Sequence, residues 1–122
     1  MQLSKDQVAA SATPMVLRIL SHGEDYGYSI LRRITEASAG RIEWSEGLLY
    51  PLLHRLERQG TVTARWGAAD TGRRRKYYSL TDAGRRELGI QTEQWEVVTA
   101  TLRALGAPPS SILATPDPRP TI

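Results

Sequence analysis

Apolar side chains recur along this chain with two different periods, and each change of period predicts a change from helix to strand or back. A spacing of three and four residues is typical of a helix with one buried face, whereas strict alternation is typical of a half-buried strand. The helical spacing occurs in four stretches and the alternation in two. The pattern predicts helices near residues 4–21, 28–39, 45–60 and 82–105, and strands over 61–66 and 73–80.

The first helix contains a proline that allows two interpretations. Thr13 and Pro14 could be an N-cap followed by proline at the first helical position, where the missing N–H is not needed. Alternatively, one longer helix begins near Ser4 and bends at Pro14, and this is the interpretation we favour.

The third helix combines a regular apolar face with a second proline. Ser45 is suited to cap its start and Gly60 to end it. Pro51 lies six residues in, where a proline removes a hydrogen bond and crowds the carbonyl four residues back. Gly47 is expected to relieve that crowding because it has no side chain. The buried face is expected to consist of leucines, namely Leu49, Leu52, Leu53 and Leu56.

The two strands predict a β-hairpin with a basic returning strand. Residues 67–72 have turn chemistry with glycine at both ends, and Tyr78 and Leu80 share one face of the second strand. The segment RIEW at 41–44 is too short for a helix and could add a small strand.

The long C-terminal helix has a heptad-like apolar seam with one polar member. Thr81 is expected to cap the start of this helix. Covering the apolar seam requires more partner surface than one small domain offers. The organisation that we predict is a DNA-binding domain over 1–80, a dimerisation helix over 81–105 and a disordered proline-rich tail over 106–122. The seam residues are Leu88, Gln91, Trp95, Val98, Leu102 and Leu105.

Positive charge is concentrated in the middle of the chain. The net charge is +3, but residues 41–81 alone carry eight basic and four acidic side chains. Arginine outnumbers lysine fourteen to two, which favours bidentate contacts to phosphate or guanine, although a GC-rich genome would produce the same bias. The charge therefore indicates a nucleic-acid partner for this part of the chain.

Several classes of protein are disfavoured. The chain has no cysteine, and neither its two histidines nor its carboxylates have the spacing of a metal site. It also lacks a phosphate-binding or dinucleotide fingerprint. We therefore expect no enzymatic activity, no cofactor and no metal. The N-terminus contains no signal or membrane-spanning segment, so we expect a cytoplasmic protein with no membrane partner.

The order of the elements predicts a mainly α fold with a small β-hairpin, a winged helix-turn-helix followed by a C-terminal dimerisation helix. The chain resembles the PadR family of transcriptional regulators up to about residue 105. It is most similar to the small branch with a single C-terminal helix, which includes multidrug-resistance repressors. The motifs that carry the resemblance are YGYSI (26–30), LLYPLLHRLERQG (48–60), Trp66 and RRKYYSLTDAG (74–84).

The resemblance implies that the helix containing Pro51 is the recognition helix, which enters the major groove by its N-terminal half. Pro51 could approach a thymine methyl group, or could be a kink without DNA contact. Tyr28 could touch the DNA backbone or pack in the core, and the cations of 73–76 could grip phosphates or be a solvated run. The candidate DNA-binding residues are Tyr28, Ser45, Gly47, Leu48, Tyr50, Pro51, His54, Arg55, Arg73, Arg74, Arg75 and Lys76.

The resemblance also implies a homodimer through the C-terminal helices, in which paired tryptophans can sandwich a planar aromatic effector. Trp95 is the matching residue, and its alternative role is an anchor of the dimer seam. Trp44 and Trp66 are expected to be aromatics of the core or of the wing base. The candidate ligand-binding residues are Ser11, Thr13, Pro14, Leu88, Gln91, Thr92, Trp95 and Thr99.

Two functions from different classes follow from this sequence. The leading hypothesis is a dimeric, ligand-responsive repressor of a double-stranded, pseudo-palindromic DNA operator. The alternative is a winged-helix module that binds another protein without effector or direct DNA readout. A steep fall of affinity with salt distinguishes them, because only phosphate contacts release counterions.

Overall fold

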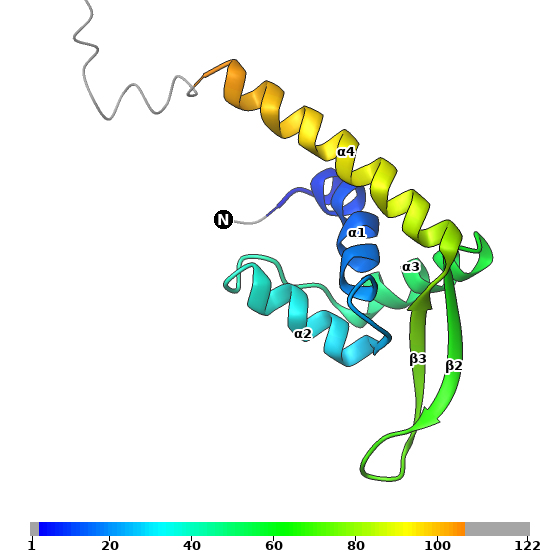
Figure 1. Ribbon diagram of the computed structural model, residues 1–122. Helices are drawn as coiled ribbons and strands as arrows, with labels where there is room; N and C mark the ends of the chain where they lie inside the picture. Colours follow the sequence, from blue (N-terminus) through cyan, green and yellow to red (C-terminus); the bar gives the residue numbers. More distant parts are fainter. Residues whose placement is uncertain (1–2, 107–122) are drawn as a thin grey trace, which may run out of the picture. The chain divides into compact units, whose positions relative to one another are not determined.

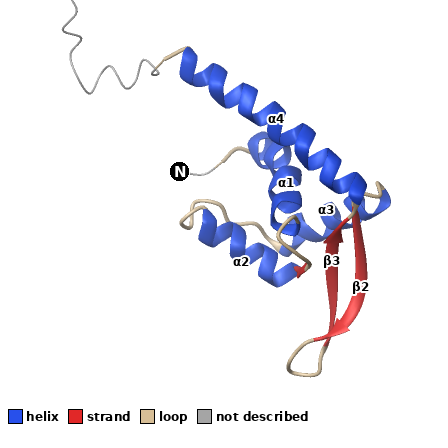
Figure 2. Ribbon diagram, viewed as in Figure 1, coloured by secondary structure: helices blue, strands red, loops and turns tan. Residues whose placement is uncertain are grey.

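The computed structural model describes residues 3–106, and its elements follow the order of a winged helix-turn-helix (Figure 1). The chain divides into two compact units at Gln91 and Thr92, and each is described by itself. Figure 2 shows the mainly helical composition and the hairpin. The elements are α1 (Lys5–Leu20), β1 (Asp25–Tyr26), α2 (Gly27–Ala37), α3 (Glu46–Arg58), β2 (Val62–Ala68), β3 (Arg74–Leu80) and α4 (Asp82–Ala104).

The first helix is continuous across its proline. Ser4 caps α1 with a capping box, in which its hydroxyl accepts from the Gln7 N–H at 3.1 Å and the Gln7 side chain accepts from the Ser4 N–H at 3.0 Å. Pro14 lies inside this helix. The prediction of one long helix from Ser4 is therefore confirmed, and the alternative start at Thr13 is wrong.

The core of the first unit lies between the three N-terminal helices and the sheet. The four leucines of α3 are at most 7% exposed, as their spacing predicts. Trp44 also joins this core at 9% exposure. The buried apolar side chains of the cluster are Ala12, Val16, Leu17, Ile19, Leu20, Ile30, Ile34, Trp44, Leu49, Leu52, Leu53, Leu56, Val62, Tyr78, Leu80 and Leu88.

The sheet has three strands rather than the two of the predicted hairpin. β3 pairs antiparallel with β2 on one side and with the two-residue β1 on the other, giving the order β1-β3-β2. The expectation that 41–44 adds a small strand is wrong, because that segment is irregular and ends at the buried Trp44. Ser38 holds it by accepting the Ile42 N–H at 2.9 Å.

The long helix begins as the sequence predicts. The Thr81 hydroxyl accepts from the Gly84 N–H at 3.0 Å and donates to the Gly60 carbonyl at 2.7 Å, so it caps α4 and ties it to the end of α3. A Cβ at Gly84 would collide with the Thr61 carbonyl oxygen and lie 2.7 Å from a Leu80 methyl, which explains the glycine. Most of the expected disordered tail, residues 107–122, lies outside the described residues.

None of the described helices is long and apolar enough to cross a membrane.

Candidate nucleic-acid interface

Helix α3 is held on the core by one face and exposes the other. The Ser45 hydroxyl accepts from the Leu48 N–H at 3.3 Å, which fixes the first turn. Pro51 and His54 are exposed, and the exposed Arg55 donates to the Thr13 hydroxyl on α1 at 3.3 Å. The exposed side of α3 therefore includes Tyr50, Pro51 and His54 between the charged Glu46 and Arg55, and it is not a continuous basic surface.

Leu48 and Gly47 lie in the first turn of α3. Leu48 is half-buried and packs against the core, so little of its side chain remains for a partner. A Cβ at Gly47 would meet only the Ser45 hydroxyl, at an ordinary 3.6 Å. The expectation that Gly47 makes room for Pro51 is therefore wrong, since the Pro51 ring is not among the atoms within 4 Å.

Tyr50 lies over the start of α2. A Cβ at Gly27 would collide with the Tyr50 hydroxyl and would lie 2.7 Å from the ring carbon that bears it. Gly27 therefore lets a side chain of α3 pack directly on the backbone of the preceding helix, while Tyr50 remains 42% exposed. This close approach fixes the position of the Tyr50 ring on the exposed side of α3.

Tyr28 is at the second position of α2 and is 63% exposed. Of the two roles considered from sequence, core packing is excluded by this exposure. The Arg32 guanidinium carbon lies 5.9 Å from the centre of the Tyr28 ring. The start of α2 thus exposes an aromatic hydroxyl beside a positive charge, a combination suited to a phosphate.

The hairpin extends away from the helices (Figure 1). Three of the four consecutive cations lie on its returning strand, and Arg73 comes directly before that strand. Arg73 and Arg74 are exposed, whereas Arg75 and Lys76 are only partly so. Lys76 donates to a Glu57 carboxylate oxygen on α3 at 3.4 Å. The four cations are adjacent in sequence but differ in exposure, since two are exposed and two are partly covered by the protein.

One face of the sheet carries a ladder of alternating aromatic rings and arginines. The Arg75 guanidinium carbon lies 3.8 Å from the Tyr26 ring centre, and the Tyr26 and Tyr77 rings meet edge-on at 5.9 Å. The Arg65 guanidinium carbon lies 4.9 Å from the Tyr77 ring centre, and Arg65 also binds Glu24 through two hydrogen bonds. These contacts link the loop before α2 to all three strands, so they hold the wing against the helix-turn-helix.

A glycine makes room for this ladder. A Cβ at Gly67 would lie 2.8 Å from an Arg65 nitrogen and 3.1 Å from the Tyr77 ring. Gly67 therefore leaves room for the Arg65 and Tyr77 side chains, and it also lies at the edge of the predicted turn.

Two titratable groups report the local environment. The hydrogen bonds from Arg65 lower the pKa of the Glu24 carboxyl below its usual value. Burial, followed by the nearby charges of Glu57 and Tyr50, raises the pKa of the Tyr78 phenol. Tyr78 is buried, and the Lys76 ammonium nitrogen lies 5.4 Å from the centre of its ring.

Sequence reasoning missed several of these contacts. Trp66 was expected in the core or at the wing base, but it is 59% exposed, with the Arg74 guanidinium carbon 4.9 Å from its ring centre. β1 was missed because two residues are too few to show a period. The alternation of charged and aromatic residues on β2 and β3 is a signal that could have indicated the ladder.

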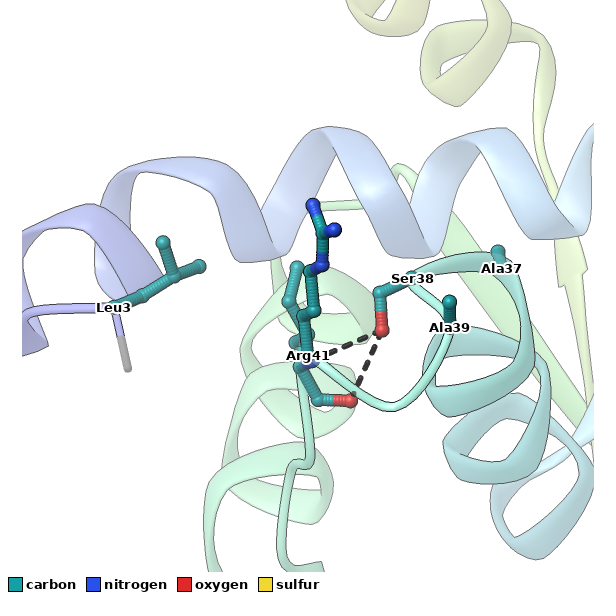
Figure 3. A pocket seen from close by; sticks show the side chains of 6 residues that line it. Leu3, Ala37, Ser38, Ala39 and Arg41 are labelled. Carbon is teal, nitrogen blue, oxygen red and sulfur yellow. Dashed lines mark hydrogen bonds between the residues drawn. The ribbon is translucent and has the colours of Figure 1, made fainter. Parts of the chain in front are cut away.

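A shallow hollow of about 470 Å³ lies apart from this surface, between the C-terminal end of α2 and the segment before α1. Figure 3 shows Ser38 and Arg41 at its rim, with the Ser38 hydroxyl hydrogen-bonded within the turn. The other lining residues, Leu3, Ala37, Ala39 and Ile42, are apolar, and none of the candidate ligand-binding residues is among them.

The candidate ligand-binding residues lie in both units. In the first unit, the Ser11 hydroxyl donates to the Gln7 carbonyl at 2.6 Å, and the Thr13 hydroxyl accepts from Arg55. Pro14 is half-buried and Leu88 is buried. The Gln91 side chain donates to the Glu87 carboxylate at 2.9 Å. In the second unit, Thr92 is half-buried, Trp95 is 40% exposed, and Thr99 donates to the Trp95 carbonyl at 2.8 Å.

Among residues 3–106 no group of three histidine, cysteine, aspartate or glutamate side chains is placed to hold a metal ion.

Comparison with known proteins gives one family and a consistent fold. The family described as "Transcriptional regulator PadR-like family" matches residues 16–90. A structure of a transcriptional regulator from Clostridium thermocellum superposes with a TM-score of 0.76 at 26% identity, covering 84% of this chain and all of that one. A PadR-like transcriptional regulator from Bacillus cereus gives a TM-score of 0.73 at 29% identity, covering 83% and 96%.

Similar sequences extend the comparison. An uncharacterized protein of Lysinibacillus sphaericus is 28% identical over 76% of this chain and 85% of its own length. The transcriptional regulator YqjI of Escherichia coli is 30% identical over 74% of this chain, and the match spans 42% of that longer protein.

Proposed function

The chain belongs to the PadR-like family of transcriptional regulators, and from that premise we propose that it is a dimeric, ligand-responsive repressor of a pseudo-palindromic operator. The family consists of DNA-binding regulators and not of enzymes, as the sequence indicated. The finer proposal concerns three features: which residues contact DNA, how two chains pair, and what relieves repression.

The observation that carries the proposal is the exposed side of α3 together with the wing. The leucine-anchored face leaves Tyr50, Pro51 and His54 in solvent, and the exposed Arg73 and Arg74 extend from the hairpin. A helix of this kind in the major groove, with a basic wing on the adjacent backbone, is the geometry of winged helix-turn-helix recognition. Compact side chains on α3 suit a close approach to base edges, and arginines on the wing suit phosphates.

Each candidate residue except Leu48, which packs against the core, has a role in this proposal. Tyr28, Ser45 and Gly47 lie at the starts of α2 and α3, where backbone N–H groups and the helix dipole favour a phosphate. Arg55 is tied to Thr13 and needs a change of rotamer to reach DNA. Arg75 and Lys76 contribute charge to the wing while bound to Tyr26 and Glu57, so we assign direct phosphate contacts to Arg73 and Arg74.

Pairing is proposed to occur through α4. The exposed apolar side chains near its C-terminal end need a partner of similar length and pattern, and a second α4 has both. A twofold dimer places two copies of α3 about one helical turn of DNA apart, which requires a pseudo-palindromic operator.

The effector is proposed to bind beside Trp95. A half-exposed indole on the dimer seam can stack on a planar aromatic compound, and the polar neighbours Gln91 and Thr92 pack a dry seam poorly. Binding there changes the spacing of the two DNA-binding units and lowers operator affinity by a coupling of about 1–3 kcal/mol.

Footprinting on the DNA upstream of the protein's own gene, repeated at increasing salt, tests the DNA-binding part. We expect a protected pair of half-sites and a steep linear fall of the logarithm of affinity with the logarithm of salt. If no binding occurs even at low salt, the repressor assignment is wrong for this chain, and binding of another protein becomes the better explanation of the exposed wing.

Tryptophan fluorescence tests the effector part. We expect planar aromatic compounds to quench the wild-type protein and to release it from DNA, and both effects to disappear in Trp95→Ala. Trp44 is buried in the core and Trp66 lies on the wing, so the two serve as internal controls. Unchanged quenching in Trp95→Ala would refute a site at this position.

A further inference from the structure

The wing carries an exposed tryptophan. Trp66 lies on β2, where more than half of its surface is in contact with solvent, so it contributes little to the core. A large exposed indole on a narrow hairpin is an unfavourable choice unless it contacts something. Among the described residues, the group that lies over the indole ring is the Arg74 guanidinium.

The strand register brings these two residues together. Trp66 is directly opposite Lys76, and Ala68 is directly opposite Arg74, so Trp66 and Arg74 are diagonal neighbours on the same face of the hairpin. Diagonal neighbours are within reach when both side chains are long. The guanidinium carbon of Arg74 consequently lies 4.9 Å from the indole ring centre, inside the range of a cation–π interaction.

The other cations of the run are held by different groups. Arg75 lies on the opposite face against Tyr26, and Lys76 is paired with Glu57 of α3. Those contacts connect the wing to the helix-turn-helix. Trp66, in contrast, holds Arg74 beyond the core, on a part of the hairpin where both side chains remain exposed.

We infer that Trp66 is a positioning residue for DNA binding, which orients Arg74 toward the phosphate backbone or the minor groove without itself contacting DNA. This inference rests on the proposed function. An arginine stacked on a fixed ring has fewer rotamers to lose when it binds a phosphate, and its guanidinium keeps its hydrogen-bond donors free at the edge. The indole thus raises affinity through Arg74 alone.

A double-mutant cycle on the footprinted operator duplex tests this inference, with affinity measured from 50 to 200 mM salt. Trp66→Ala is expected to weaken binding about two- to tenfold, the cost of ordering one flexible side chain on binding. Arg74→Ala is expected to weaken it at least as much and to reduce the salt slope by about 0.9. In the Arg74→Ala background, Trp66→Ala is expected to cause no further loss.

Two variants separate positioning from folding. Trp66→Tyr keeps an aromatic face and is expected to restore most of the wild-type affinity. Thr63→Ala removes an exposed side chain from the opposite face of the same strand and is expected to leave both affinity and salt slope unchanged. Thermal unfolding midpoints of all variants should agree within about 2 °C, because none removes a buried group.

Failure of this inference and failure of the proposed function give different binding results. If wild-type protein binds the duplex but the losses from Trp66→Ala and Arg74→Ala multiply in the double variant, Trp66 acts independently of Arg74 and the inference is wrong. The same holds if Trp66→Ala binds like wild type. If wild-type protein fails to bind at low salt, the proposed function itself is wrong.

Discussion

Helices α3 and α4 carry apolar stripes of the same kind, but among residues 3–106 the stripe of α3 is buried and most of the stripe of α4 is exposed. The four leucines of α3 are at most 7% exposed. Along α4, Leu88 is buried, whereas exposure rises through Trp95, Val98 and Leu102 to 79% at Leu105, just after the helix. The spacing of apolar residues is helical in both, so the difference lies in what each helix has to pack against.

This difference bears on the two roles that we propose for the helices. A covered stripe fixes the position of a helix within one unit, and α3 therefore presents the same exposed face in every copy of the protein. An uncovered stripe with heptad spacing is suited to association, since burying it stabilises a complex of chains instead of a single chain. The difference supports the proposal that α3 contacts DNA and that α4 pairs two chains.

The largest expected effect is on the covered stripe. Leu53→Ala removes a fully buried side chain and should lower the free energy of unfolding by about 2–5 kcal/mol, measured by urea titration. The loss should be the same at every protein concentration. Leu102→Ala, the same truncation on α4, should lose stability only at concentrations where chains associate. Equal losses below and above those concentrations would contradict the proposed pairing role of α4.

The next effect concerns the uncovered stripe. The double substitution Val98→Glu and Leu102→Glu places two charges on this stripe and should raise the dissociation constant of the dimer more than tenfold. The unfolding midpoint should then cease to depend on protein concentration. Ala100→Glu places a charge on the other side of the same helix and should change neither. Concentration-dependent light scattering measures both variants, and a dimer that survives the double substitution would show that α4 pairs by another face.

Smaller effects are expected at the helix starts. The Thr81 hydroxyl satisfies the Gly84 N–H and also bonds the Gly60 carbonyl, whereas Ser45 caps α3 with a single bond. Thr81→Ala should cost about 1–2 kcal/mol and Ser45→Ala about 0.5–1 kcal/mol in chemical denaturation. Thr81→Ser and Ser45→Asp keep a capping oxygen and should recover most of each loss. A larger loss from Ser45→Ala than from Thr81→Ala would show that the second hydrogen bond of Thr81 does not add stability.

The smallest effect is a dependence on pH above 10. Because burial raises the pKa of Tyr78 above its ordinary value, the unfolded chain releases this proton first as the pH rises. The folded state should therefore lose stability from about pH 10 upward, until Tyr78 also ionises in the folded protein. Tyr78→Phe should remove that part of the decline in urea titrations at pH 9–11, and identical declines in both proteins would show that Tyr78 does not contribute.

The sequence was sufficient for the elements with strong periodicity. The leucine face of α3, the long α1 from Ser4, the cap at Thr81 and the hairpin follow from local spacing and capping chemistry, and the structure confirms them. Local rules were sufficient there because each element is set by side chains a few residues apart.

Contacts between distant segments were not predictable in this way. β1 is too short to have a period, and the segment at 41–44 is irregular because Trp44 packs in the core instead of continuing a strand. The different fates of Arg74, Arg75 and Lys76 depend on the strand register, which places Trp66, Tyr26 and Glu57 beside them from three other elements.

The central claim is that two chains, paired through α4, place two copies of α3 on one stretch of DNA. Sedimentation equilibrium of the wild-type protein, alone and with its operator duplex, tests this most directly. The account predicts a species of twice the 13.6 kDa of one chain, and two chains for each bound duplex. A single chain that occupies the operator with full affinity would contradict it.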